Sequence, residues 1–338
     1  MKSRRQWGIQ RAIGFGISQS ARFLRAFLYD GFNQDEQRRR VFDGVWAHVA
    51  GAGRGSFNVR FAQPSRDVRA FLDIFSPADI PPFTDRKLLA REIRTNTIPK
   101  LFLSNGSSEY WTRCASLIHT TPDGKADLDP MPTTRIYIFA GAQHWMGSLP
   151  PPKIAARNLG NINDYRCAFR ALLIDMQEWI KDGKAPPPSH IPKLAKGQLV
   201  PIAKLAFPRI PGIQPPKHQR EAYRLNFSTV PPKLGPAYPT FVLQVNADGN
   251  NLGAIDMPEI QVPLGTSTGW NLPLAGATGD LFALAGSYIP FPKTKTEREA
   301  DHDPRRSIAE RYPNESAYLN EIVDAAEHLV QHRLLLQG

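Results

Sequence analysis

Short apolar runs that end near a glycine recur along the first half of the chain. Three of these runs predict buried strands, over residues 10–17, 99–106 and 134–141. Continuous apolar runs of this length are typical of parallel strands that are covered on both faces. The pattern therefore predicts a parallel sheet built from the first half of the chain.

Apolar residues at helical spacing predict helices around this sheet, and strands that alternate with helices indicate an α/β fold. The predicted helices cover residues 19–32, 85–94, 164–180 and 314–335. The expected apolar face of the last helix comprises Ala317, Leu319, Ile322, Val323, Ala326 and Leu329. Residues 34–46 show the same spacing through Val41, Val45 and Trp46, which predicts a further helix there.

The proline content divides the chain into two parts. A chain of 338 residues can bury a large core, and its 31 prolines concentrate after residue 149. Prolines at this density predict long extended connections. We expect residues 1–185 to form the core, and residues 186–338 to form a proline-rich wrapping segment with a C-terminal helix in the same domain.

Composition excludes several classes of function. The net charge is +11, but the basic residues are dispersed, and the densest cluster is Arg38–Arg40. We therefore expect no nucleic-acid partner. The chain has no apolar run long enough to span a bilayer, so we also expect no membrane partner. Cys114 and Cys167 lie in no metal-binding pattern, which predicts two reduced thiols and no metal.

One motif between the first predicted strand and the first predicted helix carries chemistry. Gly16, Ser18 and Ser20 form the pattern Gly-x-Ser-x-Ser. A strand, this pattern and a helix together make a nucleophile elbow, in which a sharp turn displays a serine above a sheet. The turn needs small residues on both sides of the serine because strand and helix approach closely. Ser20 stands where a second glycine is usual.

A serine nucleophile needs a histidine as base and a carboxylate that orients the histidine. Glu109 follows the second predicted strand and His144 follows the third, so these strand ends offer the order serine, acid, histidine. His48 and His119 are alternative bases. The alternative acids are Asp79, Asp85, Asp123, Asp127 and Asp129.

The chain resembles a family of bacterial α/β-hydrolase-domain proteins over nearly its whole length. The elbow and the residues after it, Gly16 to Arg25 with Arg22-Phe23-Leu24-Arg25, match the family pattern. Further similar stretches are residues 42–45, 48–58, 60–67, 105–111, 139–144, 265–272 and 286–291. The resemblance implies an α/β-hydrolase fold and a serine hydrolase with Ser18 as nucleophile, Glu109 as acid and His144 as base.

The expected reaction is cleavage of a small-molecule carboxylic ester through an acyl-enzyme, with no cofactor. The backbone N–H of Gln19 is the expected oxyanion donor, since it follows the nucleophile directly. A second donor normally comes from a loop after an earlier strand, and such a loop has no counterpart here.

The front of the chain departs from the family pattern, because only about one strand precedes Ser18. We expect an incomplete α/β-hydrolase sheet that lacks an N-terminal part. The alternative function is a catalytically silent fragment, or a subunit that needs the missing half. As it stands, the chain is expected to be cytoplasmic, and it would be exported if a signal lies in a missing part.

Overall fold

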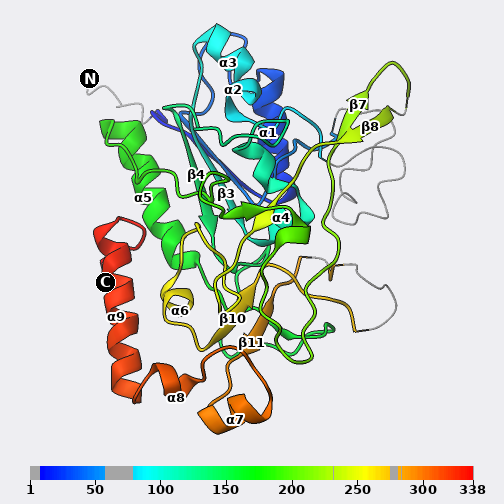
Figure 1. The fold of residues 1–338 in the computed structure, drawn as a ribbon. Helices are drawn as coiled ribbons and strands as arrows, with labels where there is room; N and C mark the ends of the chain where they lie inside the picture. Colours follow the sequence, from blue (N-terminus) through cyan, green and yellow to red (C-terminus); the bar gives the residue numbers. More distant parts are fainter. Residues whose placement is uncertain (1–7, 58–78, 231, 275–280, 283, 338) are drawn as a thin grey trace, which may run out of the picture.

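A four-stranded parallel sheet lies at the centre of the molecule (Figure 1). The structure, a computed structural model, describes residues 8–57, 79–230, 232–274, 281–282 and 284–337. The strands pair in sequence order and are β1 (Ile13–Ile17), β2 (Gly44–His48), β3 (Lys100–Gly106) and β4 (Thr134–Phe139). The three strands predicted from apolar runs are confirmed, with the first beginning at Ile13.

Strand β2 occupies the end of the segment for which the spacing predicted a helix over residues 34–46, so that prediction was wrong. Val45 pairs with Gly14 of β1 on one side and with Leu101 of β3 on the other. Every residue of β2 is buried, and Trp46 is 2% exposed. Apolar residues four apart suit a helix face, but here pairing with two neighbouring strands decides the conformation.

Helices cover both faces of the sheet. Figure 1 shows α1 (Gln19–Asp30) on one side and α5 (Arg166–Asp182) on the other. Each of these helices ends at a glycine in the left-handed conformation, Gly31 with φ 85° and Gly183 with φ 71°. A glycine adopts this conformation without the steric cost that other residues meet. The sequence therefore predicts both helix ends.

Shorter elements link the sheet strands and build the rest of the molecule. The short helices are α2 (Asp85–Leu88), α3 (Ala90–Thr95), α4 (Ser108–Thr112), α6 (Pro258–Gln261), α7 (Lys295–Ala300) and α8 (Ile308–Arg311), with 3₁₀ turns at Ala115–Ile118 and Ile202–Lys204. A small antiparallel sheet pairs β10 (Gly265–Thr268), β11 (Ser287–Pro290) and β5 (Leu159–Gly160) in that order. Two further pairs are β6 (Leu199–Val200) with β9 (Val242–Leu243), and β7 (Tyr223–Asn226) with β8 (Lys233–Ala237).

The second half of the chain packs into the same apolar core as the first. Leu199, Phe241 and Leu329 belong to the buried cluster that contains Trp46 and Phe102 of the central sheet. Backbone contacts also extend the sheet beyond β4. The Ile138 N–H donates to the His190 carbonyl over 3.1 Å, and the Ala140 N–H donates to the Ile255 carbonyl over 2.9 Å. The later segments thus lie directly against the free edge of β4.

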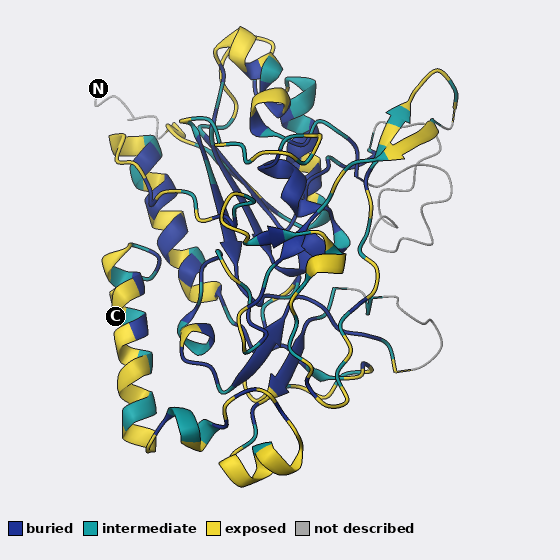
Figure 2. Ribbon diagram, in the orientation of Figure 1, coloured by how far each residue is buried: buried dark blue, intermediate teal, exposed yellow. Residues whose placement is uncertain are grey.

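The last helix, α9 (Glu315–Gln331), lies on the surface, as Figure 2 shows. Ala325 and Leu329 are its buried residues. Leu319 and Val323 are 50% and 53% exposed, so the apolar face predicted for this helix was wrong at these two positions. Only a narrow stripe of α9 meets the core, because residues four apart share one helix face.

Glu92 on α3 is a buried carboxylate. It is fully buried, and neither carboxylate oxygen has a hydrogen-bond partner in the part of the chain that the structure describes. Burial raises the pKa of Glu92 from 4.5 to about 7. A raised carboxyl pKa means that the folded state prefers the protonated form, so the stability conferred by this preference is present at low pH and is lost as pH rises through 7.

Glu92→Gln should therefore increase the free energy of unfolding at pH values above 7, by about 2 kcal/mol, and change it little near pH 4.5. Urea unfolding followed by circular dichroism at both pH values measures the difference. Glu327 is exposed on α9, and its Gln variant is the control. If both variants respond alike at the two pH values, the buried carboxylate is not the cause.

Candidate active site

Ser18 occupies a strained turn between β1 and α1. Its backbone angles are φ 57° and ψ −116°, a left-handed conformation that is costly for a residue other than glycine. The Ser18 N–H donates to the His48 carbonyl over 2.9 Å, and the Arg22 N–H donates to the Ser18 carbonyl over 3.0 Å. The sheet on one side and the helix on the other thus hold the turn in place.

Gly16 is required by the close approach of strand and helix. A Cβ atom at this position would lie 2.7 Å from the carbonyl carbon of Ser20 and 2.8 Å from the amide nitrogen of Ala21. Both are backbone atoms of α1, so a side chain here would push the helix away from β1. Ser20 itself is exposed.

The structure brings together the three side chains that the sequence singles out. Ser18 ends β1, Glu109 lies on α4 directly after β3, and His144 lies in the loop after β4. His144 Nε2 lies 2.8 Å from the Ser18 Oγ, and His144 Nδ1 lies 2.6 Å from Glu109 Oε1. The three strands belong to one parallel sheet, in which β3 and β4 are adjacent and β2 separates β1 from β3, so their carboxyl ends lie on the same edge.

The Glu109 carboxylate fixes how the histidine ring is used. Its Oε2 accepts the Gly106 N–H over 2.8 Å, so the other oxygen faces His144. An ionised carboxylate only accepts, which places the ring proton on Nδ1 and leaves Nε2 to accept from the Ser18 hydroxyl. Glu109 is fully buried and His144 is 2% exposed, whereas Ser18 is partly exposed. Among the three, the serine is thus the one open to a ligand.

Gln19 is the first residue of α1, directly after Ser18. Its amide therefore lies at the helix N-terminus, where backbone N–H groups and the helix dipole favour negative charge. This is the place at which the sequence predicts an oxyanion donor.

The two alternative histidines have partners other than the Ser18 hydroxyl. His48 at the end of β2 is fully buried, and its Nδ1 pairs with the Ser104 Oγ over 2.9 Å. Burial, with a smaller contribution from the nearby His144, holds the pKa of His48 well below its usual range. His119 pairs with the Tyr110 hydroxyl over 2.7 Å, and burial lowers the pKa of His119 to about 3. Both rings are neutral parts of the core.

The alternative acids have other partners. Asp79 is 3% exposed and lies among three arginines, with Arg220 Nε at 3.0 Å and terminal nitrogens of Arg22 and Arg113 at 3.9 and 3.8 Å. Arg22 is on α1 and Arg113 follows α4, so this ionic group joins the helix after Ser18 to the helix of Glu109. The remaining acids contact backbone amides or surface groups and are Asp85, Asp123, Asp127 and Asp129.

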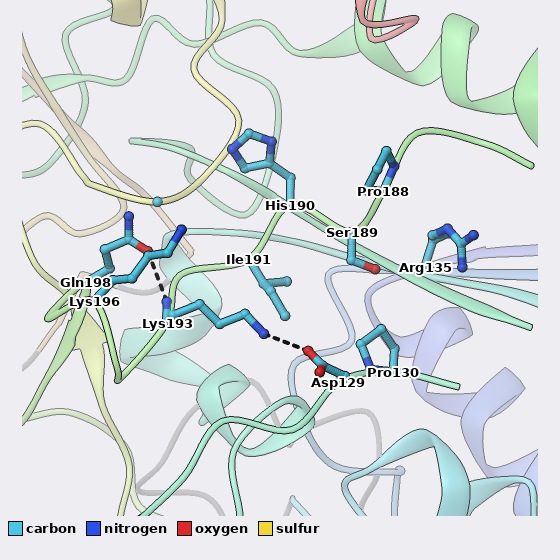
Figure 3. Close-up of a pocket in the computed structure, with 11 residues that line it drawn as sticks. Asp129, Pro130, Arg135, Pro188, Ser189, His190, Ile191, Lys193, Lys196 and Gln198 are labelled. Atoms are coloured by element: carbon cyan, nitrogen blue, oxygen red, sulfur yellow. Dashed lines mark hydrogen bonds and ion pairs between the residues drawn. The ribbon is translucent and has the colours of Figure 1, made fainter. Parts of the chain in front are cut away.

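A separate hollow of about 520 Å³ opens beside β4 (Figure 3). Lys193 and Lys196 line it, and Lys193 pairs with Asp129 over 3.0 Å, as the figure shows. The Ser189 hydroxyl oxygen accepts the Ile136 N–H over 2.9 Å and so belongs to the extension of the sheet. The described residues that line this hollow include none of the Ser18, Glu109 and His144 group.

The described residues contain no group of three or more His, Cys, Asp or Glu side chains that could hold a metal ion. Cys114 is buried and Cys167 is exposed, and both are free thiols. Within the same part of the chain, no helix is long and apolar enough to cross a membrane.

Sequence reasoning did not identify the polar side chain that contacts the segments before Glu109 and His144, which is Asn251. Asn251 contacts both Ser107, before α4, and Gly141, after β4. Its surroundings, Asn246 to Asn251 with Gly249, have the composition of a turn, and that is the only local signal they carry. Asn251 lies 144 and 110 positions from these two partners and directly follows none of the three predicted strands, so sequence reasoning had no ground to place it at the site.

A strand, a strained serine and a helix, with an acid and a histidine from later strand ends, define the class of α/β hydrolases. A family model described as "Alpha/beta hydrolase domain" matches residues 4–338. The chain therefore belongs to the alpha/beta hydrolase domain family, and the α/β fold predicted from the sequence is confirmed. No curated protein and no solved structure matches the chain.

Proposed function

We propose that this protein is a serine hydrolase that cleaves carboxylic esters of small molecules. The observation that carries the proposal is the continuous hydrogen-bonded chain from Ser18 through His144 to Glu109, with distances of 2.8 and 2.6 Å. These separations lie within the reach that proton transfer between nucleophile and base requires. Membership of the alpha/beta hydrolase domain family supports the same class of reaction.

In the first half of the reaction, His144 Nε2 takes the Ser18 hydroxyl proton while Oγ forms a bond to the ester carbonyl carbon. The carbonyl oxygen becomes negatively charged, and the Gln19 amide donates a hydrogen bond to it. Glu109 stabilises the imidazolium that forms. The C–O bond to the alcohol then breaks, and His144 gives the proton to the leaving oxygen.

In the second half, His144 takes a proton from water, and the water oxygen attacks the acyl carbon. The bond from Ser18 Oγ to that carbon breaks, Oγ regains the proton from His144, and the carboxylic acid leaves. Every proton moves between groups named here, so the cycle needs no cofactor.

Treating the purified chain with a fluorophosphonate probe tests this proposal, because such probes phosphonylate an activated serine. We expect one adduct, located on Ser18 by peptide mass spectrometry. Ser20→Ala is the matched control, since Ser20 is an exposed serine two positions away, and this variant should label like the wild type.

Circular dichroism shows whether each sample is folded. A folded chain that remains unlabelled would contradict the proposal. That result would favour the alternative function, a catalytically silent subunit. An adduct on another serine would reject Ser18 as the nucleophile.

A further inference from the structure

The loops that carry Glu109 and His144 are joined by one side chain from the second half of the protein. We define the Glu109 loop as residues 106–109, from the last residue of β3 to the second residue of α4, and the His144 loop as residues 140–144. The Ser107 hydroxyl donates to Asn251 Oδ1 over 2.6 Å, and the Gly141 N–H donates to the same oxygen over 3.0 Å. A single amide oxygen therefore accepts one hydrogen bond from each loop.

The orientation of the Asn251 amide follows from its partners. A backbone N–H can only donate, so the atom of Asn251 that faces Gly141 must be the oxygen. The backbone beneath it is also fixed, since Asn251 bridges to Val245 across a turn with Gly249 at φ 84°. The acceptor thus reaches both loops from a rigid support.

Other polar side chains near the site hold only the His144 loop. Asn161 Nδ2 donates to the Gly141 carbonyl over 2.7 Å, and Asn163 Nδ2 donates to the Ala140 carbonyl over 2.6 Å. The Gln143 Oε1 accepts the Gly286 N–H over 2.9 Å. None of these three bonds reaches the Glu109 loop. The Ser108 N–H donates to the Ala142 carbonyl over 3.1 Å, so one backbone bond joins the two loops directly, and Asn251 adds a side-chain link beside it.

We propose that Asn251 is a positioning residue that sets the placement of Glu109 relative to His144. Ser107 lies two residues before Glu109, and Gly141 lies three residues before His144, so a shift between their loops changes the 2.6 Å contact directly. This role of Asn251 rests on the proposed serine hydrolase function. A misplacement of about 1 Å in a catalytic group can reduce a rate about a hundredfold.

Asn251→Ala removes the shared acceptor and should reduce kcat for p-nitrophenyl acetate about tenfold to a hundredfold, with KM little changed. Asn251→Asp keeps an oxygen that accepts from both loops and should retain most of the activity. Asn158→Ala is the matched control, because Asn158 is equally half-buried and bonds to Ser287 rather than to either loop. A melting temperature for each variant reports its overall stability.

A merely structural role predicts that Asn251→Ala and Asn158→Ala lose activity only as far as they lose stability. That outcome would overturn the proposal, as would full kcat in a folded Asn251→Ala variant. Failure of the Asp variant to rescue kcat would also count against a shared acceptor.

A second measurement does not depend on turnover. A short hydrogen bond from an imidazole to a carboxylate gives a strongly downfield proton resonance, which His144→Gln assigns by removing it. We expect this resonance in the wild type and in Asn251→Asp, and its loss or displacement in Asn251→Ala. An unchanged resonance in Asn251→Ala would reject the positioning role. If the wild type carries no adduct on Ser18, the proposed function fails while this measurement still decides the role of Asn251.

Discussion

Replacing Ser18 with Ala should abolish ester turnover and leave the protein folded. The variant lacks the oxygen that His144 activates at 2.8 Å, so no acyl-enzyme can form. Loss of the nucleophile from a complete triad costs roughly a millionfold in kcat. Initial rates with p-nitrophenyl esters measure the effect, and a thermal melt reports the fold.

Ala at this position keeps the strained backbone but loses no buried packing, because Ser18 is only partly buried. We therefore expect the melting temperature to stay close to that of the wild type. The Ser20→Ala control should keep its activity, since that side chain is exposed. Turnover retained in the Ser18→Ala variant would reject the nucleophile and with it the proposed mechanism.

Replacing Glu109 with Gln should give the second largest loss, about ten-thousandfold in kcat. The neutral amide nearly preserves the shape of the side chain but removes the charge that stabilises the imidazolium. It also offers N–H groups to His144 Nδ1, which favours the wrong tautomer of the ring. Steady-state kinetics should show the loss in kcat rather than in KM.

Asp123→Asn provides a control for Glu109→Gln. Asp123 is a carboxylate that also follows β3, but it lies exposed in a turn and pairs with Thr121. We expect this variant to keep nearly full activity. Equal losses in the two variants, or a loss below tenfold in Glu109→Gln, would remove Glu109 from the acid role.

The sequence predicts the parts of this fold that have strong local signals. Strands β3 and β4 each contain a short apolar run, and α1 and α5 end at glycines that leave the right-handed region. The turn at Ser18 also has a local signal, because the small residues that it requires lie within five positions, from Gly16 to Ser20. These are features whose physical cause lies in neighbouring residues.

Strand β2 shows where a local pattern fails. Val41, Val45 and Trp46 have helical spacing, yet β2 begins at Gly44 and pairs with a strand on each side. A strand buried on both faces has no alternation that would separate it from a short helix. Its conformation depends on partners that lie on average dozens of positions away, and a single sequence does not contain that information.

The candidate site divides in the same way. The order of Ser18, Glu109 and His144 at strand ends is visible in the sequence, because parallel strands place their carboxyl ends together. The hydrogen bonds from Ser107 and Gly141 to Asn251 are not visible in the sequence, because these two residues lie 144 and 110 positions from Asn251. Long-range polar contacts of this kind are found only once the backbone is folded.

The late position of Asn251 in the chain has a consequence for synthesis. Ribosomes add about 5–20 residues each second, so the 110 positions between Gly141 and Asn251 correspond to roughly 5–20 s. For nearly all of that interval the nascent chain contains the four strands β1 to β4 and the Ser18, Glu109 and His144 side chains, but not Asn251. We expect the nascent protein to acquire full catalytic competence only after translation has passed residue 251.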